Sequence, residues 1–163
     1  MLAPSLVVVD TSATVEALVS DAPLNDRYRQ LFRELRACDA RLVWCELLEV
    51  ELLEAAFAWD VRRERGRDWR RERRTGELQR TRALEQTIVA DWRAFTAGIR
   101  TSVISTASLL EDAASMMGTT GLGSADAVHL AVARSLGAPI LTHDRLMIHA
   151  ARRWPGVLTE RSP

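Results

Sequence analysis

The sequence is poor in several residue types, and each shortage excludes a class of protein. It has no lysine and only two cysteines, Cys38 and Cys45, in 163 residues. Two cysteines without further Cys or His at ligand spacing exclude a disulfide-stabilised secreted scaffold and a structural zinc site. No apolar run is long enough to cross a membrane, and the opening MLAPSLVVVD lacks the basic region of a signal peptide. We therefore expect reduced thiols in a cytoplasmic protein that does not associate with a membrane.

An excess of one charge is also missing from the chain as a whole. The 22 basic residues, all arginine, are balanced by 22 acidic residues, so any binding to nucleic acid must depend on a local patch. Residues 62–82 contain ten arginines and four acids, a local charge of +6, with Trp59 before this segment and Trp69 within it. Arginine and tryptophan suit RNA, whereas the spacing of Glu64–Arg67 and Asp68–Arg71 equally suits a solvated helical arm. Both interpretations stay open.

Short apolar runs alternate with helical periodicities along the chain. Strands are predicted at residues 5–10, 41–44, 101–105 and 139–142. Helices are predicted at residues 11–19, 26–38, from 45 onwards, up to Met117, 125–136 and 145–153, the last closed by Pro155 and Gly156. This alternation indicates an α/β protein with a mostly parallel sheet covered on both faces, as a single domain over residues 1–163. Residues 59–98 are predicted to form a helical, arginine-rich insertion, and GTTGLGS (118–124) to form a loop.

Two acidic residues follow predicted strands. Asp10 ends the run VVVD, and Asp144 follows PILTH. The carboxyl ends of parallel strands share one edge of a sheet, where open α/β folds build their sites, so we expect both side chains at that edge. For each acid alone, a simpler explanation is that it caps the helix that follows.

A third acid, Glu51, lies on the apolar face of a predicted helix. At about 100° per residue it projects away from Glu46 and Glu49, which share a face that can meet water. A carboxylate on an apolar face is costly unless a metal ion or an arginine satisfies it, although a slight tilt of the helix would let it reach solvent. The choice of Glu51 over Glu49 or Glu46 depends on where the helix begins.

A fourth acid, Asp126, opens the apolar helix ADAVHLAVA. There it complements the helix dipole, but this does not explain why several strand and helix ends each carry one acid facing a common edge. Four converging carboxylates suit Mg²⁺ or Mn²⁺ better than zinc. Such ions lower the pKa of bound water and neutralise a phosphodiester, so the pattern favours metal-assisted hydrolysis. We predict these acids as the catalytic and metal-binding set: Asp10, Glu51, Asp126 and Asp144.

Other polar and apolar residues have plainer explanations. Hydroxyl side chains are candidate donors that orient the carboxylates: Thr11, Ser12 and Thr142. His129, three residues after Asp126, is expected to be a hydrogen-bonded core histidine rather than a ligand. His143 is expected to point away from Asp144, and His149 to lie at the surface. Core or interface positions are predicted for large apolar residues: Trp44, Trp92, Leu109, Leu110 and Met116.

Taken in order along the chain, four segments resemble the PIN domain family. VVVDTSATVEAL is similar to the opening strand and helix of that family and carries Asp10. CELLEVELLEA resembles its second acidic segment, with Glu51, and GLGSADAVHLAVA resembles the third, with Asp126. PILTHDRLM is similar to the fourth, with Asp144. The ordered set covers nearly the whole chain apart from residues 59–98, a stretch longer than in compact members of the family.

The resemblance implies a three-layer α/β/α fold with an acidic pocket that binds Mg²⁺ or Mn²⁺. It implies endonucleolytic cleavage of RNA, and small members of the family are mostly VapC-type toxins of type II toxin–antitoxin pairs. A cognate antitoxin then inserts a segment into the active-site groove, often with a basic residue among the acids, and a homodimer is expected. The alternative is a non-catalytic PIN-like module that binds RNA or protein.

Two other α/β classes fit less well. A strand ending in Val-Asp-Thr-Ser also resembles phosphatases of the haloacid dehalogenase type. Those enzymes need a second aspartate where this chain has Ser12, and a later lysine, which the chain lacks. A response-regulator-like switch needs an adjacent acidic pair near the first strand and a lysine after the last, and neither is present.

Overall fold

The computed structural model describes residues 4–66, 83–152 and 159–160, and its centre is a parallel sheet. Five strands lie in the order β3-β2-β1-β4-β5, and every neighbouring pair is parallel. Their bounds are β1 Leu6–Val9, β2 Arg41–Cys45, β3 Arg100–Ile104, β4 Ile140–Leu141 and β5 Thr159–Glu160. The predicted α/β class with a parallel sheet is therefore confirmed.

The strand order creates a switch point between β1 and β4. From β1 the chain moves outward to β2 and β3, and it returns to the other side of β1 as β4. At the carboxyl end of this pair, the backbone N–H of Asp10 donates to the carbonyl of Leu141 at 3.0 Å. Open α/β sheets place ligand sites in the crevice at such a point, so Asp10 lies where a site is expected.

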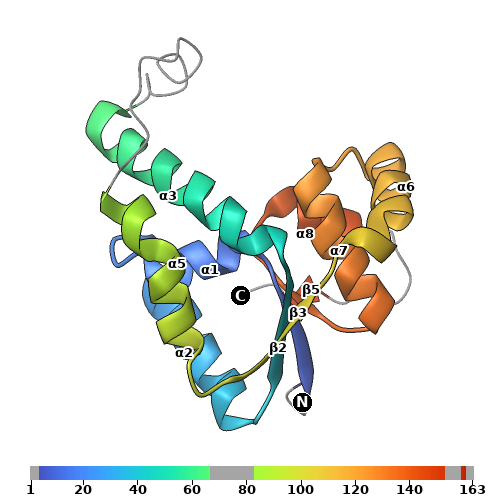
Figure 1. Cartoon of the computed structure of the whole chain (residues 1–163), viewed down its shortest axis with the longest axis horizontal. Coiled ribbons are helices and arrows are strands. Elements are labelled where there is room, and N and C mark those ends of the chain that lie inside the picture. The colour runs from blue at the N-terminus through green and yellow to red at the C-terminus, as the bar shows by residue number, and fades with distance from the viewer. Residues whose placement is uncertain (1–3, 67–82, 153–158, 161–163) are drawn as a thin grey trace.

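Helices cover both faces of the sheet, which gives three α/β/α layers (Figure 1). One layer consists of α1 Thr11–Leu18, α2 Asn25–Ala37, α3 Leu47–Arg65 and α5 Ala83–Thr96. The other consists of the 3₁₀ helix η2 Ala107–Leu109, α6 Leu110–Thr120, α7 Ser124–Leu136 and α8 Arg145–Ala151. The predicted three-layer architecture is confirmed.

Alternate strand residues divide the core between the two helical layers. On β1, Val7 and Val9 pack with the layer of α1, α2, α3 and α5, whereas Val8 packs with the layer of α6, α7 and α8. On β2, Leu42 and Val43 divide in the same way. Because both faces of these strands are buried, their sequences read as continuous apolar runs rather than as alternating ones.

Much of the predicted helical stretch 59–98 belongs to the body of the fold. α3 ends at Gly66, whose positive φ of 61° suits glycine. α5 packs beside α3 and buries Ile88 and Trp92 completely. Residues 67–82 lie outside the described residues, so the predicted arginine-rich patch and its ion pairs stay predictions.

Some predicted boundaries differ from the structure. GTTGLGS, predicted as a loop, is helical up to Thr120, and within this last turn the hydroxyls of Thr119 and Thr120 donate to carbonyls one turn earlier. The helix ends at Gly121, with a φ of 74°. The two-residue strand β5 was not predicted. Pro155 and Gly156, predicted to close the last helix, lie outside the described residues.

The predicted large apolar residues divide into core and surface. Buried positions are confirmed for four of them: Trp44, Trp92, Leu109 and Met116. Leu110 is 58% exposed, so it is not a core residue, and its place at an interface stays a prediction. Among the described residues, no helix combines the length and the apolar character needed to cross a membrane.

Asn25 holds the turn between α1 and α2 and allows a test of the fold. Its Nδ2 donates to the carbonyls of Glu16 (2.9 Å), Ala17 (3.1 Å) and Val19 (2.9 Å). Carbonyls at a helix end lack partners within the helix, so Asn25→Ala is expected to lower the free energy of unfolding by about 1–3 kcal/mol. Urea unfolding measures this, with Gln30→Ala on the exposed face of α2 as the control. An equal loss in both variants would contradict the capping role.

Candidate active site

Asp10 is buried at the end of β1 among hydroxyl groups. Its Oδ2 accepts hydrogen bonds from Thr142 Oγ1 at 2.7 Å, from the backbone N–H of Ser12 at 3.3 Å and from the Ser12 hydroxyl. The bond from the Ser12 N–H makes Asp10 the N-cap of α1. Both sequence-based explanations of Asp10 are therefore correct: it caps a helix, and it lies at the carboxyl edge of the sheet.

Asp144 occupies the corresponding position after β4. Its Oδ1 accepts from the backbone N–H of Met147 at 2.9 Å, so Asp144 is the N-cap of α8. Its own N–H donates to Thr142 Oγ1 at 3.0 Å. Thr142 is fully buried, and its single hydroxyl links the Asp144 backbone to the Asp10 carboxylate.

Glu51 projects from α3 toward α1 and α7. Its Oε2 accepts from Thr11 Oγ1 at 2.8 Å and lies 2.5 Å from His129 Nε2. Glu49 instead forms a two-pronged ion pair with Arg93 on α5, at 2.9 and 2.6 Å. The direction of Glu51 thus agrees with the helical wheel, and Glu49 lies away from this group of side chains. That Glu51 is a ligand stays a prediction.

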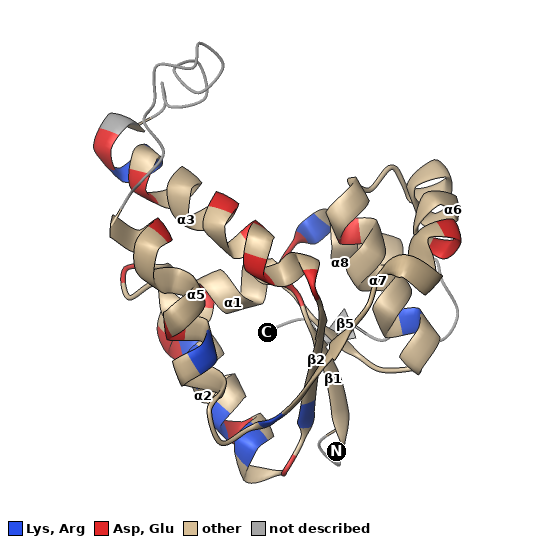
Figure 2. Cartoon of the chain, viewed as in Figure 1, with Lys and Arg blue, Asp and Glu red and all other residues tan. Residues whose placement is uncertain are grey.

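Asp126 lies in the first turn of α7, and its pKa responds to the other three acids. Burial raises its pKa to about 6, and the charges of Asp10, Asp144 and Glu51 add to the rise, while His129 lowers it. Charges act on a pKa in this way at short range. Acidic positions at α3, α7 and the start of α8 gather above the sheet (Figure 2).

His129 is a core residue, as predicted, and it also contacts the site. It is fully buried, with Nδ1 3.6 Å from Cys45 Sγ and Nε2 beside Glu51. Burial alone would lower the pKa of His129, but hydrogen bonds with Cys45 and Glu51 and nearby negative charge raise it well above its ordinary value. The contact with Glu51 was not predicted. The one signal in the sequence is the position of His129 one helical turn after Asp126.

His143 does not join the acids but packs against α1 and α2. Its Nε2 lies 3.7 Å from Glu16 Oε1, and its ring meets Tyr28 edge-on with centroids 5.8 Å apart. Glu16 is buried, and its Oε2 accepts from the backbone N–H of Leu24 at 2.7 Å. Sequence reasoning missed Glu16, whose signal was an acid inside the apolar helix ATVEAL. His149 is exposed, as predicted.

The chemistry of the site fits a hard divalent cation. Asp10, Glu51 and Asp144 are each held through one carboxylate oxygen, and no hydrogen bond between described residues reaches the other oxygen. Carboxylate oxygens are the ligands that Mg²⁺ and Mn²⁺ prefer. In the described part of the chain, however, no three His, Cys, Asp or Glu side chains are arranged to hold an ion as they stand. Asp126 has no hydrogen bond to a described residue, so its carboxylate is not fixed as those of the other three acids are.

Two clefts open beside the acids. One, of about 430 Å³, is lined by Thr11 and Ser12 and by residues of α3 that include Trp59. The other, of about 410 Å³, is lined by Thr142, His143 and residues of α8. None of the four acids lines either cleft, but the hydroxyl residues that hydrogen-bond to Asp10 and Glu51 do.

The chain is similar to known proteins over most of its length. The family model of the PIN domain matches residues 7–153. Among solved structures, VapBC2 from Rickettsia felis, bound to a DNA fragment from its promoter, has a TM-score of 0.60 and 14% identity, over 95% of this chain and 97% of that chain. PAE2754 from Pyrobaculum aerophilum has a TM-score of 0.53 and 19% identity, over 94% of this chain and 89% of that chain. No curated protein matches significantly. At these identities the two structures show a shared fold.

Proposed function

This chain belongs to the PIN domain family, and from that premise we propose that it is a metal-dependent endoribonuclease, the toxin of a toxin–antitoxin pair. The observation that carries the proposal is the placement of the acids at the switch point of the sheet: Thr142 links Asp10 to Asp144, Thr11 contacts Glu51, and the charges of these three acids add to the effect of burial on the pKa of Asp126. Crowded carboxylates that raise one another's pKa are typical of a functional site. The metal is Mg²⁺ or Mn²⁺, and the ligands are the predicted acids: Asp10, Glu51, Asp126 and Asp144.

The side chains around the acids support this chemistry by orienting them. When bound, a divalent cation lowers the pKa of water and neutralises charge on a phosphodiester. Ser12 and Thr142 hold Asp10 through Oδ2, which leaves Oδ1 without a hydrogen bond from a described residue. Thr11 and His129 hold Glu51 in the same way through Oε2. Partners of this kind commonly change metal affinity or activity by about 10–100-fold.

An antitoxin is the proposed protein partner. The similar structure from Rickettsia felis is a toxin–antitoxin complex. The cleft of about 430 Å³ between α1 and α3 is lined by Thr11 and Ser12, which hydrogen-bond to the acids. An antitoxin segment bound in this cleft would be able to place a basic side chain among the carboxylates. The positive charge of that side chain would offset the repulsion from the other acids that, together with burial, raises the pKa of Asp126. A homodimer and a cytoplasmic location belong to the same proposal.

RNA cleavage by the purified chain tests the function. We expect structured RNAs to be cut internally with Mg²⁺ or Mn²⁺, cutting to stop in EDTA, and fresh metal to restore it. A panel of RNAs is needed, because a selective enzyme is inactive on the wrong substrate. A variant with both Asp10→Asn and Asp126→Asn, purified in parallel, controls for contaminating nucleases.

Two results would contradict the proposal. Equal cleavage by the chain and by the double variant would assign the activity to a contaminant. No cleavage of any RNA with either metal, together with tight binding of RNA or of a protein partner, would support the non-catalytic binding module instead.

A further inference from the structure

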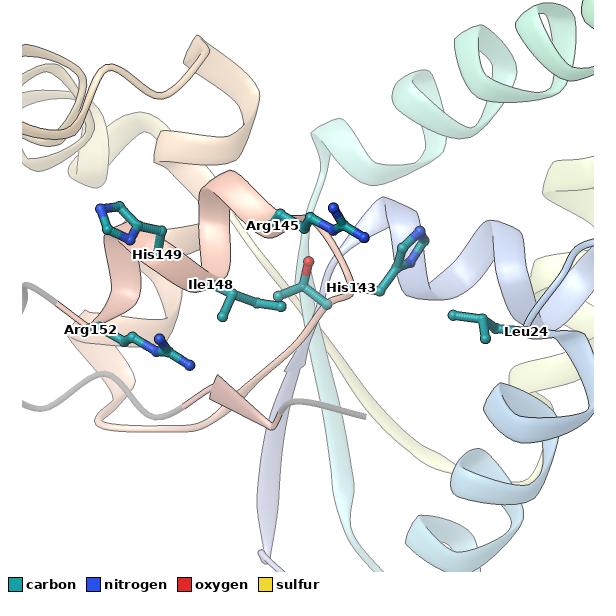
Figure 3. Close-up of a pocket in the computed structure, with 7 residues that line it drawn as sticks. Leu24, His143, Arg145, Ile148, His149 and Arg152 are labelled. Carbon is teal, nitrogen blue, oxygen red and sulfur yellow. The ribbon is translucent and has the colours of Figure 1, made fainter. Parts of the chain in front are cut away.

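A basic pocket on α8 borders the acids. This α8 pocket, of about 410 Å³, is lined by Thr142, Arg145, Ile148 and Arg152, among others. In Figure 3, Arg145 and Ile148 come from α8, Arg152 follows the last residue of this helix, and His143 and Leu24 lie on the facing side. Its wall therefore combines guanidinium groups with aliphatic side chains.

Thr142 connects this pocket to the acids directly. The residue lines the pocket, and its hydroxyl donates to Asp10 Oδ2 at 2.7 Å. Asp144, the cap of α8, comes immediately before Arg145. A ligand in the α8 pocket therefore lies against Thr142, one hydrogen bond from Asp10, although none of the four acids lines the pocket itself.

The two arginines of the pocket are available to a ligand. Both Arg145 and Arg152 are exposed, and neither makes an ion pair with a described residue. Arg93 and Arg100, by contrast, are paired with acids at 2.6 and 3.0 Å. His143 and His149 also line the pocket, and His143 has Glu16 beside it.

We propose that the α8 pocket binds the nucleotide next to the cleaved bond of a single-stranded RNA, with successive phosphodiesters on Arg145 and on Arg152, which lie about two helical turns apart. This inference rests on the proposed nuclease function. Guanidinium groups match the geometry of phosphate oxygens. The pocket is also large enough for a nucleotide unit, whose sugar and base would meet the aliphatic wall at Ile148 and Leu24.

The charge distribution explains why such a pocket is needed. The chain has no net charge, so no overall field attracts RNA. At the site itself the crowded acids repel a polyanion. Cations directly beside the acids offset that repulsion and fix the strand relative to the reacting group. An acidic peptide would also pair with two arginines. The pocket lies beside the proposed catalytic acids, however, and this position favours a phosphodiester of the substrate as its ligand.

RNA binding without metal tests the pocket independently of cleavage. A fluorescein-labelled single-stranded RNA of about 12 nucleotides is titrated in EDTA and followed by anisotropy. Every protein carries Asp126→Asn, which lowers the acidic charge. Arg145→Gln and Arg152→Gln are each expected to raise Kd about tenfold, and the plot of log K against log salt to become shallower by roughly 0.7 for each phosphate that the variant no longer neutralises.

The matched control is Arg41→Gln. Arg41 is also exposed and also lacks an ion pair with a described residue, but it begins β2 at the opposite edge of the sheet. The control is expected to bind RNA as the parent does. Melting curves verify that all variants are folded.

The outcomes separate the pocket from the nuclease proposal. If both pocket variants bind RNA more weakly and the chain cleaves no RNA with either metal, the RNA-binding pocket is supported and the proposed nuclease function is contradicted. Unchanged RNA affinity in the pocket variants, or no RNA binding by the parent, overturns the pocket and leaves the nuclease to the cleavage assay. Unchanged RNA affinity together with weakened binding of a polyglutamate peptide would assign the pocket to an acidic protein segment.

Discussion

Asp126→Asn is expected to make the metal-free protein more stable at pH 7.5 and, in the same variant, to reduce metal-dependent RNA cleavage about a hundredfold or more. Burial and the charges of Asp10, Asp144 and Glu51 raise the pKa of Asp126 to about 6. Ionised Asp126 is thus held in the folded state against repulsion, and a neutral amide removes that cost. The same carboxylate is a proposed metal ligand, so its loss removes function.

The pH dependence of this stabilisation follows from the direction of the shift. The folded pKa of about 6 lies above the ordinary 3.8, so between these values the folded state binds more protons than the unfolded state. Stability therefore falls as pH rises through that interval. Below pH 4 the variant gains nothing, and above pH 6 it gains the full amount, about 1–2 kcal/mol after allowance for solvent screening of a half-exposed group.

Thermal melts in EDTA from pH 4 to 8 measure the gain in stability of Asp126→Asn, and RNA cleavage with Mn²⁺ measures its loss of activity. Asp91→Asn, on an exposed position of α5, is the control and should change neither. Asp10→Asn is an instructive contrast, because it also loses cleavage but weakens the acceptor of Ser12 and Thr142, so it should melt lower. If Asp126→Asn melts below the wild type at pH 7.5 without metal, the acids do not repel one another as described.

The sequence predicted the layers and the common edge of the acids because local patterns specify both. A run of three valines followed by Asp10 indicates a buried strand and its carboxyl end without any tertiary information. The helical wheel of α3 gave the direction of Glu51, since Glu49 meets Arg93 on the outer side of the helix. Each of these predictions depended on residues close together in the chain.

Contacts between distant segments could not be predicted in this way. The trio of Cys45, Glu51 and His129 joins a strand end to two helices, and its members are up to 84 residues apart. The α8 pocket likewise needs Leu24 opposite α8. β5 pairs with β4, and its two residues carry no recognisable strand pattern of their own.

His129→Leu is expected to lower the free energy of unfolding by about 2–4 kcal/mol, because it removes one partner of a buried charged pair. His129 is fully buried, and its Nε2 lies 2.5 Å from Glu51 Oε2. Its pKa is raised above 6.5 in the folded state, against the effect of burial, by hydrogen bonds with Cys45 and Glu51. Stabilisation from the protonated ring is therefore complete below pH 6.5 and is lost as pH rises through the folded pKa. The gap between variant and wild type should be widest in acid.

A second readout separates a positioning role for His129 from a purely structural one. Without His129, Thr11 alone holds Glu51 among the described residues, so cleavage should fall about 10–100-fold. His129→Gln keeps a donor that can reach Glu51 and should recover more activity than stability. Ser135→Ala, exposed on the same helix, controls for changes in α7 and should shift stability by less than about 0.5 kcal/mol.

The combination of His129→Leu with Glu51→Gln decides what the buried pair contributes. If the ring stabilises the fold by satisfying the Glu51 carboxylate, a neutral amide at position 51 makes its loss less costly, and the double variant unfolds less readily than the two single effects predict. Strict additivity, with equal cleavage by His129→Leu and His129→Gln, would mean that His129 only fills the space between α7 and β2. The orientation of Glu51 would then depend on Thr11, and the function of the site would not require a buried histidine.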